Sequence, residues 1–283
     1  GNIAQEQADD AVSGKYMTHI SIDERENGSM GIAHTGMSVM AGHDYQLSLW
    51  LKGTSNMGAT IALYGCSATN GSRNTLAGAN IASISGTMTK YTVTLTPTAS
   101  DSDACLFIGG AGIGDLWIDQ ISLMPLDASE VSCGGWRTDF VESLRALDPG
   151  ALRWPGGILS DWYDWEDAIG AEKDLRKPLY FAQWNATWMS NDVGIDEFLQ
   201  LCEYLDIHPV INVNYATSTA SHAAEFVEYV NGAVSTAKGA LRASNGHSEP
   251  YAITWWEIGN ETWGSWVPNP STADVFASGY NDF

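Results

Sequence analysis

Apolar and polar residues alternate along the chain up to about residue 126. The alternation is clearest at positions 45, 47, 49 and 51, and again at positions 91, 93 and 95. Because successive side chains of a strand point to opposite faces, each run predicts a strand with one buried face. Five short strands are expected between turns rich in Gly, Ser, Thr and Asn: Tyr45–Leu51, Thr60–Tyr64, Tyr91–Leu95, Leu106–Ile108 and Leu116–Leu123. This pattern predicts an antiparallel β-sandwich over residues 1–126.

From residue 127 onward the apolar residues recur every three or four positions, which is the period of a helix. Three helices are expected from this spacing: residues 140–147, Ile195–Leu205 and Ser221–Val230. Three short apolar strands lie between and after them: Ala151–Trp154, Pro209–Val213 and Ala252–Ile258. Alternation of strand and helix predicts a parallel sheet with crossover connections. The polar stretch 232–250 has no clear period, so we expect an exposed loop there.

The length of the second part limits how much of a barrel it can form. A closed (β/α)8 barrel usually takes about 250 residues, whereas residues 127–283 number 157. We therefore expect a multidomain β plus α/β chain, in which a sandwich (1–126) precedes an incomplete barrel (127–283).

The net charge of the chain limits the classes of partner that it is expected to bind. The formal net charge of -21 arises from only 13 Lys and Arg against 34 Asp and Glu. Such a surface repels nucleic acid and anionic membranes, so neither is an expected partner. No apolar run approaches the roughly 18 residues of a membrane span. Neutral substrates fit this chain best.

The four cysteines form no CxxC pair and have no His at the spacing of a zinc site. Cys66 and Cys105 could form a disulfide if the protein is exported, and free buried thiols fit the sequence equally well. No cofactor is expected, although a structural calcium ion in the sandwich remains open.

A carboxylate at the end of the third apolar strand is the first candidate for chemistry. This strand runs into Gly259, Asn260 and Glu261, followed by Trp263. Barrel enzymes keep catalytic groups at the C-terminal ends of their strands. Asn260 could hold a sugar hydroxyl, and the Trp263 ring could lie against the C–H face of a sugar. The structural alternative is a capping or ion-paired glutamate.

A second candidate cluster follows the strand Ala151–Trp154. Arg153 could bind a carboxylate through two hydrogen bonds, and the next loop interleaves acidic residues with aromatic ones such as Trp165. Asn214, directly after Pro209–Val213, is a further expected substrate-binding residue. For any one loop residue the alternative is an aromatic ring packed in a structural loop. Ten of the 12 tryptophans lie after residue 130, which favours a carbohydrate cleft.

Four motifs follow one another in a characteristic order: Leu152–Gly157, Tyr163–Gly170, Gly194–Glu203 and Trp256–Gly264. In this order they resemble the α-L-arabinofuranosidases of glycoside hydrolase family 51. The resemblance implies a (β/α)8 barrel, of which this chain would hold about strands 2 to 4. It also implies that Glu261 is the general acid/base, that Asn260 binds the sugar near its 2-hydroxyl, and that Arg153 orients the nucleophile. Residues 1–126 more loosely resemble a jelly-roll carbohydrate-binding module, chiefly through Asp115–Leu123.

Two departures from the family pattern change what is expected. Ile158 stands where these enzymes commonly carry Asn or Cys, so a polar contact to the sugar would be missing. The family's nucleophile lies at the end of strand seven, and only 22 residues follow Glu261. Glu257 is about 13 Å from Glu261 along a strand, against about 5 to 5.5 Å in retaining pairs. We expect Glu257 to be a buried partner of a base.

We therefore expect a second polypeptide or fragment to supply the nucleophile and the rest of the barrel, and the isolated chain to be inactive. The expected activity is retaining release of α-L-arabinofuranosyl residues from arabinoxylan or arabinan. The alternatives are β-xylosidase or endo-glucanase activity on the same scaffold, and a carbohydrate-binding fragment without catalysis. Action on plant polysaccharide favours an extracellular or periplasmic location.

Overall fold

The computed structural model describes residues 1–24, 30–66, 74–126, 129–130, 135–183 and 186–283. The chain divides into two compact units, Gly1–Ser129 and Glu130–Phe283. This division lies three residues beyond the boundary expected from the sequence. Among the described residues, no helix has the length and apolar character that crossing a membrane requires.

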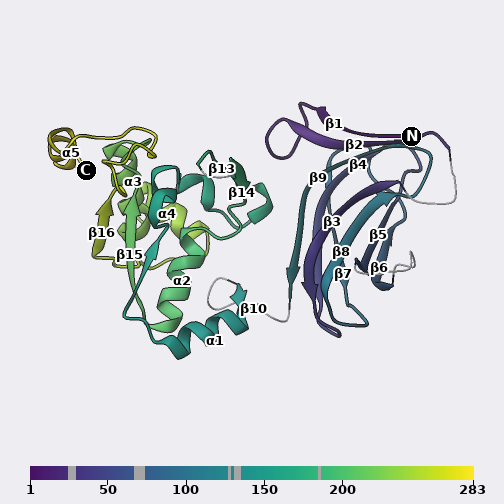
Figure 1. Ribbon diagram of the computed structural model, residues 1–283, viewed down its shortest axis with the longest axis horizontal. Coiled ribbons are helices and arrows are strands. Elements are labelled where there is room, and N and C mark those ends of the chain that lie inside the picture. Colours follow the sequence, from purple (N-terminus) through teal and green to yellow (C-terminus); the bar gives the residue numbers. More distant parts are fainter. Residues whose placement is uncertain (25–29, 67–73, 127–128, 131–134, 184–185) are drawn as a thin grey trace. The chain divides into compact units, whose positions relative to one another are not determined.

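The first unit is a sandwich of two antiparallel sheets (Figure 1). One sheet has the order β1-β2-β9-β4-β7, with strands Asn2–Gln7, Tyr16–Ile22, Gly114–Pro125, Tyr45–Gly53 and Thr89–Leu95. The other has the order β3-β8-β5-β6, with strands Gly31–Val39, Asp101–Gly110, Ala59–Gly65 and Thr75–Ile81. The expected β-sandwich is confirmed, with four strands (β1, β2, β3 and β6) beyond those predicted.

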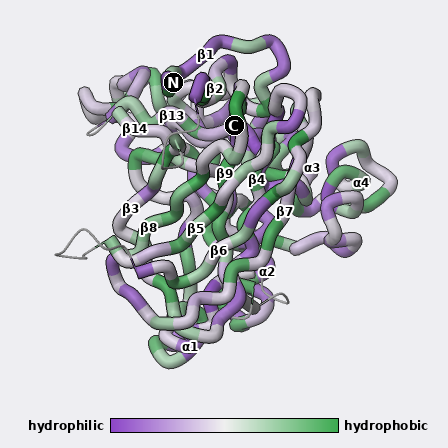
Figure 2. The backbone as a smooth tube through the Cα atoms, turned by 90° about the vertical axis from the view of Figure 1, so that its right-hand side faces the viewer, coloured by the Kyte–Doolittle hydropathy of each residue, from purple (hydrophilic) through white to green (hydrophobic). Residues whose placement is uncertain are grey.

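The alternation seen in the sequence places one face of each strand in the core between the two sheets. Leu47, Leu49 and Leu51 of β4 are fully buried, whereas the residues between them are partly exposed. They share one core with Ile61 and with other apolar residues of the opposite sheet. Figure 2 shows hydrophobic positions recurring along β8 and β5, the two middle strands of the four-stranded sheet. Burial of apolar area, at about 25 cal/mol per Å², is the main favourable contribution to the folding free energy of this sandwich.

A disulfide joins Cys66 to Cys105 in the sandwich. Cys66 directly follows β5, and Cys105 lies in the neighbouring strand β8. Of the two alternatives left open by the sequence, the structure has the bonded pair.

The second unit contains three parallel strands in the order β12-β15-β16 (Figure 1). These strands are Ala151–Trp154, His208–Val213 and Trp255–Ile258. Five helices accompany them: α1 Thr138–Leu147, α2 Ile195–Leu205, α3 Ala220–Asn231, α4 Ala237–Ser244 and α5 Ala273–Tyr280. Two small two-stranded sheets are also present: β10 Ser129–Glu130 pairs with β11 Trp136–Arg137, and β13 Leu179–Phe181 pairs antiparallel with β14 Thr187–Met189. The three strands lie in the sheet in the same order as in the sequence, as they do in consecutive βα units of a barrel.

The buried faces of α2 and α3 fix the sheet in place. Phe198 and Leu199 of α2 pack with Ile211 of β15 and Phe226 of α3 in one core. All four side chains are at most 4% exposed. Both helices were expected from their apolar spacing, and their burial gives the strand ends a rigid support.

The expectation of an exposed loop at 232–250 was wrong, because α4 lies within it. The helix is held by Arg242, whose side chain is fully buried. Its guanidinium donates to the backbone oxygens of Tyr229, Gly232 and Ser248 at 2.7, 2.8 and 3.0 Å, among other carbonyls. An arginine that binds backbone carbonyls leaves no periodic apolar pattern, which is why the helix was missed.

Candidate active site

A strained turn follows β16 and carries the predicted acid. Gly259 and Glu261 both have left-handed backbone conformations, with φ of 70° and 46°. A Cβ atom on residue 259 would lie 2.6 Å from a Thr262 methyl carbon and 2.9 Å from Tyr215 Cβ, so glycine is required there. Glutamate rarely adopts a positive φ, and such residues cluster at functional sites. The turn places Glu261 three residues beyond the end of β16.

Glu261 is exposed and lies beside two indole rings. Its Oε2 accepts a hydrogen bond of 3.1 Å from Nε1 of Trp266. Trp263 is 67% exposed and meets Trp266 edge to face, at 5.0 Å between ring centroids. Within the part of the chain that the structure describes, no Lys, Arg or His forms an ion pair with Glu261. The carboxylate is therefore available to a substrate, next to an exposed aromatic face.

Arg153 connects the end of β12 to β16 and its turn. Its Nε forms an ion pair with Glu257, and its Nη2 donates to Oδ1 of Asn260 at 3.2 Å. This contact orients the Asn260 amide beside Glu261. Glu257 is thus the partner of a base, as expected, but its side chain is 41% exposed rather than buried. The expected role of Arg153 toward a nucleophile stays a prediction.

Asn212 of β15 also supports this group and was not predicted. It is 1% exposed, and its Nδ2 donates to Oε2 of Glu257 and to the Gly259 backbone oxygen, both at 3.0 Å. A lone amide within the apolar strand Pro209–Val213 is the signal that could have revealed it, since buried amides require partners.

A second unpredicted residue, Asp161, lies below the turn. It ends the short 3-10 helix Gly157–Asp161 and is fully buried. Burial raises the pKa of its carboxyl group to about 6; the backbone N–H of Asn260 and the charge of Arg153 act against this rise, and the charge of Glu261 adds to it. Asp161 is therefore close enough to the catalytic candidates to interact electrostatically with two of them.

Trp165 has a different place from the one predicted. It is 2% exposed, stacks on Phe226 with 5.3 Å between ring centroids, and donates from Nε1 to the His222 backbone oxygen at 3.3 Å. Neither ring face is open, so the prediction that Trp165 binds substrate was wrong. The apolar ring packs in the core beneath the loop.

Asn214 lies in a pocket apart from the turn. The pocket has a volume of about 350 Å³, and its lining includes Tyr180 and Trp188, but none of Arg153, Asn260 and Glu261 among the described residues. The Asn214 amide donates to the Tyr163 backbone oxygen and to Thr217 Oγ1, and it accepts from the Thr217 N–H. The structure thus brings Glu261, Asn260, Trp263 and Arg153 together at the end of β16, and leaves Asn214 outside this group.

Ile158, the departure from the family pattern, fills an apolar position. It is 6% exposed and packs with Phe181 and Val267. An Asn or Cys side chain at this position would bring a polar group that Ile158 lacks.

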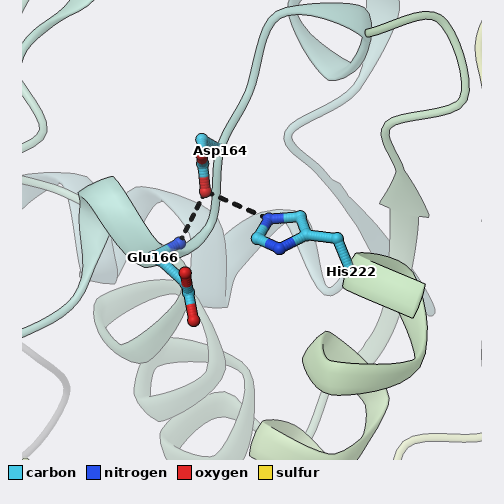
Figure 3. Close-up of side chains that lie close together, drawn as sticks. All are labelled: Asp164, Glu166 and His222. Carbon is cyan, nitrogen blue, oxygen red and sulfur yellow. Dashed lines mark hydrogen bonds and ion pairs between the residues drawn. The ribbon is translucent and has the colours of Figure 1, made fainter. Parts of the chain in front are cut away.

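Three side chains in this unit converge as metal ligands would. Figure 3 shows Asp164, Glu166 and His222, whose ligand atoms lie within 4.8 Å of one another. His222 Nε2 is already 3.1 Å from Asp164 Oδ1, and Lys238 forms an ion pair with Glu166. The Lys238 ammonium therefore supplies positive charge beside the group. In the described part of the sandwich no comparable group occurs, and the calcium ion stays an open expectation.

Comparisons with known proteins bear directly on this arrangement. Residues 143–273 match the family described as the α-L-arabinofuranosidase 1 domain. The chain is 39% identical over 143 residues to a probable α-L-arabinofuranosidase C of Aspergillus flavus, covering 50% of this chain and 28% of that protein. It is 34% identical over 157 residues to an intracellular exo-α-L-arabinofuranosidase of Bacteroides ovatus, covering 56% of this chain and 29% of that protein. Over this part of its length the chain is similar to α-L-arabinofuranosidases.

Solved structures extend this similarity to the fold. An α-L-arabinofuranosidase of Thermotoga maritima in complex with arabinose is 37% identical, with a TM-score of 0.50, over 53% of this chain and 30% of its own. An arabinose-bound family 51 enzyme superposes with a TM-score of 0.77 over 93% of this chain and 46% of its own, at 23% identity, so it shows the fold alone. The chain spans less than a third of the length of the curated relatives that it matches. The resemblance read from the four motifs is confirmed.

Proposed function

We propose that this chain contributes the general acid/base residue of a retaining glycosidase. The enzyme releases α-L-arabinofuranosyl residues from plant cell-wall polysaccharide. The observation that carries the proposal is Glu261, an exposed carboxylate just beyond the C-terminal end of a parallel strand, next to Asn260 and bound by Trp266. Among the described residues it has no cationic partner. Relatives named as α-L-arabinofuranosidases support the choice of sugar.

In the proposed reaction Glu261 protonates the glycosidic oxygen as the bond to the sugar breaks. A nucleophilic carboxylate attacks from the opposite face to form a glycosyl-enzyme, and Glu261 then removes a proton from the attacking water. Glu257 is unsuited to be the nucleophile because it lies in β16 four positions before Glu261, which corresponds to about 13 Å of extended chain, whereas retaining pairs are about 5 to 5.5 Å apart. We assign the nucleophile and the remaining strands to polypeptide outside residues 1–283. Intact and native mass of the purified protein would show whether this is the same chain or a second one.

The test is Glu261→Gln in the complete protein, assayed on an aryl α-L-arabinofuranoside with a poor leaving group. General acid catalysis contributes about 10²- to 10⁴-fold, so a loss of that size is expected, with polysaccharide binding retained. Glu249→Gln, at an exposed position, is the matched control and should leave the rate unchanged. Equal activity of the two variants would refute the proposal and favour a carbohydrate-binding fragment without catalysis.

The second candidate is another activity on the same scaffold, β-xylosidase or endo-glucanase. Ile158 favours it, because the polar group that these arabinofuranosidases commonly place there is replaced by a buried apolar side chain. Rates on aryl arabinofuranoside, aryl xyloside and glucan separate the candidates. A higher kcat/KM on xyloside or glucan would replace the arabinofuranosidase assignment.

We propose an extracellular or periplasmic location, which the disulfide Cys66–Cys105 supports. Disulfides form and persist in oxidising compartments and are rare in the cytosol. The Bacteroides ovatus relative is described as intracellular, and only 34% identity relates the two. Mass spectrometry of the unreduced protein from its native source tests the location, since free thiols at both positions would contradict it.

A further inference from the structure

A pocket with exposed aromatic rings lies in the second unit, and none of the steps above uses it. Its volume is about 350 Å³, and its lining includes Tyr180, Trp188, Asp164 and Asn214. Sites for small ligands usually have about 300 to 1,000 Å³ and combine aromatic side chains with a few polar groups. The pocket therefore has the size and the mixed lining of a site for one unit of a polymer.

The β13–β14 hairpin supplies the aromatic part of the lining. Tyr180 and Trp188 are paired directly across the two strands, so both rings lie on one face of the hairpin. Their ring centroids are 4.9 Å apart, and the two residues are 43% and 66% exposed. Neither ring belongs to an apolar core of the described residues. Single exposed apolar residues are common, but two adjoining rings in one pocket indicate a binding surface.

The loop after β12 supplies polar groups to the same pocket. Oδ1 of Asp164 accepts a hydrogen bond from the Glu166 N–H at 3.1 Å and lies 3.1 Å from Nε2 of His222 (Figure 3). These contacts fix the Asp164 side chain, which is still 46% exposed, so its second oxygen can accept a hydrogen bond from a hydroxyl. Lys177 is bound to Asp167 at 2.6 Å and, as an ammonium group, has further N–H donors to offer.

The pocket opens at the same edge of the parallel sheet as Glu261. Asp164 and the hairpin follow β12, Asn214 follows β15, and Glu261 follows β16. These strands are parallel, so their C-terminal ends meet at one edge of the sheet. Neighbouring strands lie about 4.8 Å apart, which places the end of β12 roughly 10 Å from that of β16. A chain of sugars with one end at Glu261 can therefore extend to the pocket.

We propose that this pocket, named here the hairpin pocket, binds a neutral sugar residue of the polysaccharide on the leaving-group side of the cleaved bond. The inference deepens the proposed function and rests on it: the released arabinofuranosyl residue is terminal, so every other sugar of the polymer lies on that side. The rings of Tyr180 and Trp188 lie against the apolar C–H face of the sugar, and Asp164 accepts hydrogen bonds from its hydroxyls. The acidic side chain in the lining disfavours a uronic acid.

The test compares two substrates in the complete protein. One is an arabinose-substituted xylo-oligosaccharide or an arabinan fragment, whichever the wild type hydrolyses faster, and the other is an aryl α-L-arabinofuranoside. For Trp188→Ala we expect kcat/KM on the oligosaccharide to fall about 10-fold through KM, because this contact is made equally before and in the transition state. The aryl substrate has no sugar that reaches the pocket and should change less than about twofold. Trp188→Phe keeps a ring and should recover most of the loss.

Trp255→Ala is the matched control. Trp255 is also an exposed indole, at 50%, but it begins β16 and therefore lies at the opposite edge of the sheet. Its removal should leave the ratio of the two kcat/KM values within about twofold of the wild-type ratio. Equal falls on both substrates in Trp188→Ala, or an unchanged KM on the oligosaccharide, overturn the inference.

Direct binding separates failure of this inference from failure of the proposed function. Calorimetric titration of each oligosaccharide into Glu261→Gln, with and without Trp188→Ala, requires no catalysis. We expect the Kd to rise about 10-fold in the double variant. Equal Kd values refute the hairpin pocket, whereas a wild type that hydrolyses neither substrate refutes the proposed function. Tyr180→Ala, on the other strand of the hairpin, should raise the same Kd and replaces Trp188→Ala if that variant does not fold.

Discussion

At the scale of single residues, the site combines strain with an uncompensated charge. Gly259 and Glu261 hold positive φ values, and neither carboxylate oxygen of the buried Asp161 has a hydrogen-bond partner among the described residues. The positive φ of Glu261 and the buried carboxylate of Asp161 each lower the stability of the folded state. Active sites commonly trade stability for function in this way.

The cost of Asp161 can be measured as a dependence of stability on pH. Burial raises the pKa of Asp161 to about 6 from 3.8, so the folded state binds this proton more tightly than the unfolded chain. The carboxyl group therefore favours folding below about pH 4, and this contribution is lost as the pH rises through about 6. Asp161→Asn should be more stable than the wild type above pH 6, by up to about 3 kcal/mol, and equal to it below pH 4. Urea unfolding at pH 4, 6 and 8 checks this.

An exposed carboxylate provides the comparison. Asp282→Asn changes charge by the same amount at a solvent-accessible position, so its effect should stay within about 0.5 kcal/mol at every pH. A difference between Asp161→Asn and the wild type that does not depend on pH would show that ionisation of Asp161 carries no stability cost.

At the scale of elements, α2 and α3 were predictable and α4 was not. The first two bury apolar faces, with Phe198, Leu199 and Phe226 at helical spacing. Helix α4 depends on Arg242, and one buried arginine gives no periodic signal. Strands β1 and β3 were missed for a related reason: they are largely exposed, so their sequences do not alternate.

The same distinction explains what could be predicted of the site. Glu261, Asn260, Trp263 and Arg153 stand in local motifs at strand ends, and motifs are visible in sequence. Trp165 looked like a sugar platform because sequence does not tell an exposed indole from a buried one. The burial of Asp161 and the contacts of Asn212 with residues 45 or more positions away arise only in the fold.

The dependence of α4 on Arg242 gives a prediction at this scale. Arg242→Met keeps an apolar side chain of similar length but leaves the carbonyls of Tyr229, Gly232 and Ser248 without their donor. A hydrogen bond to a charged group contributes about 1.5 to 3 kcal/mol, so the variant should lose at least about 3 kcal/mol. Hydrogen exchange should accelerate across residues 232–250 before the rest of the unit.

A surface arginine is the control for this substitution. Arg145 lies on α1, half exposed, and pairs with Glu142 three positions earlier. Arg145→Met should change stability by less than about 0.5 kcal/mol, as exposed ion pairs usually do. If both variants lost the same stability, Arg242 would have no special role in α4.

At the scale of the whole molecule, the two units differ in how they are stabilised. The sandwich has one extended apolar core and a covalent link between neighbouring strands, whereas Glu130–Phe283 holds a smaller parallel sheet covered by helices. Among the described residues, Cys202 is the free cysteine, and it is buried in the core of the second unit. Reduction should therefore act on one unit and spare the other.

The Cys66–Cys105 disulfide closes a loop with a sequence separation of 39. Loop closure of this length should contribute about 3 to 4 kcal/mol by restricting the unfolded chain, although strain can reduce the figure. In calorimetry of the chain, a reductant should lower the melting temperature of the sandwich transition and leave that of the second unit in place. Cys202→Ala, which removes the buried thiol, should keep this response to reductant unchanged. A reductant effect on both transitions would mean that the two units unfold together rather than as separate cooperative bodies.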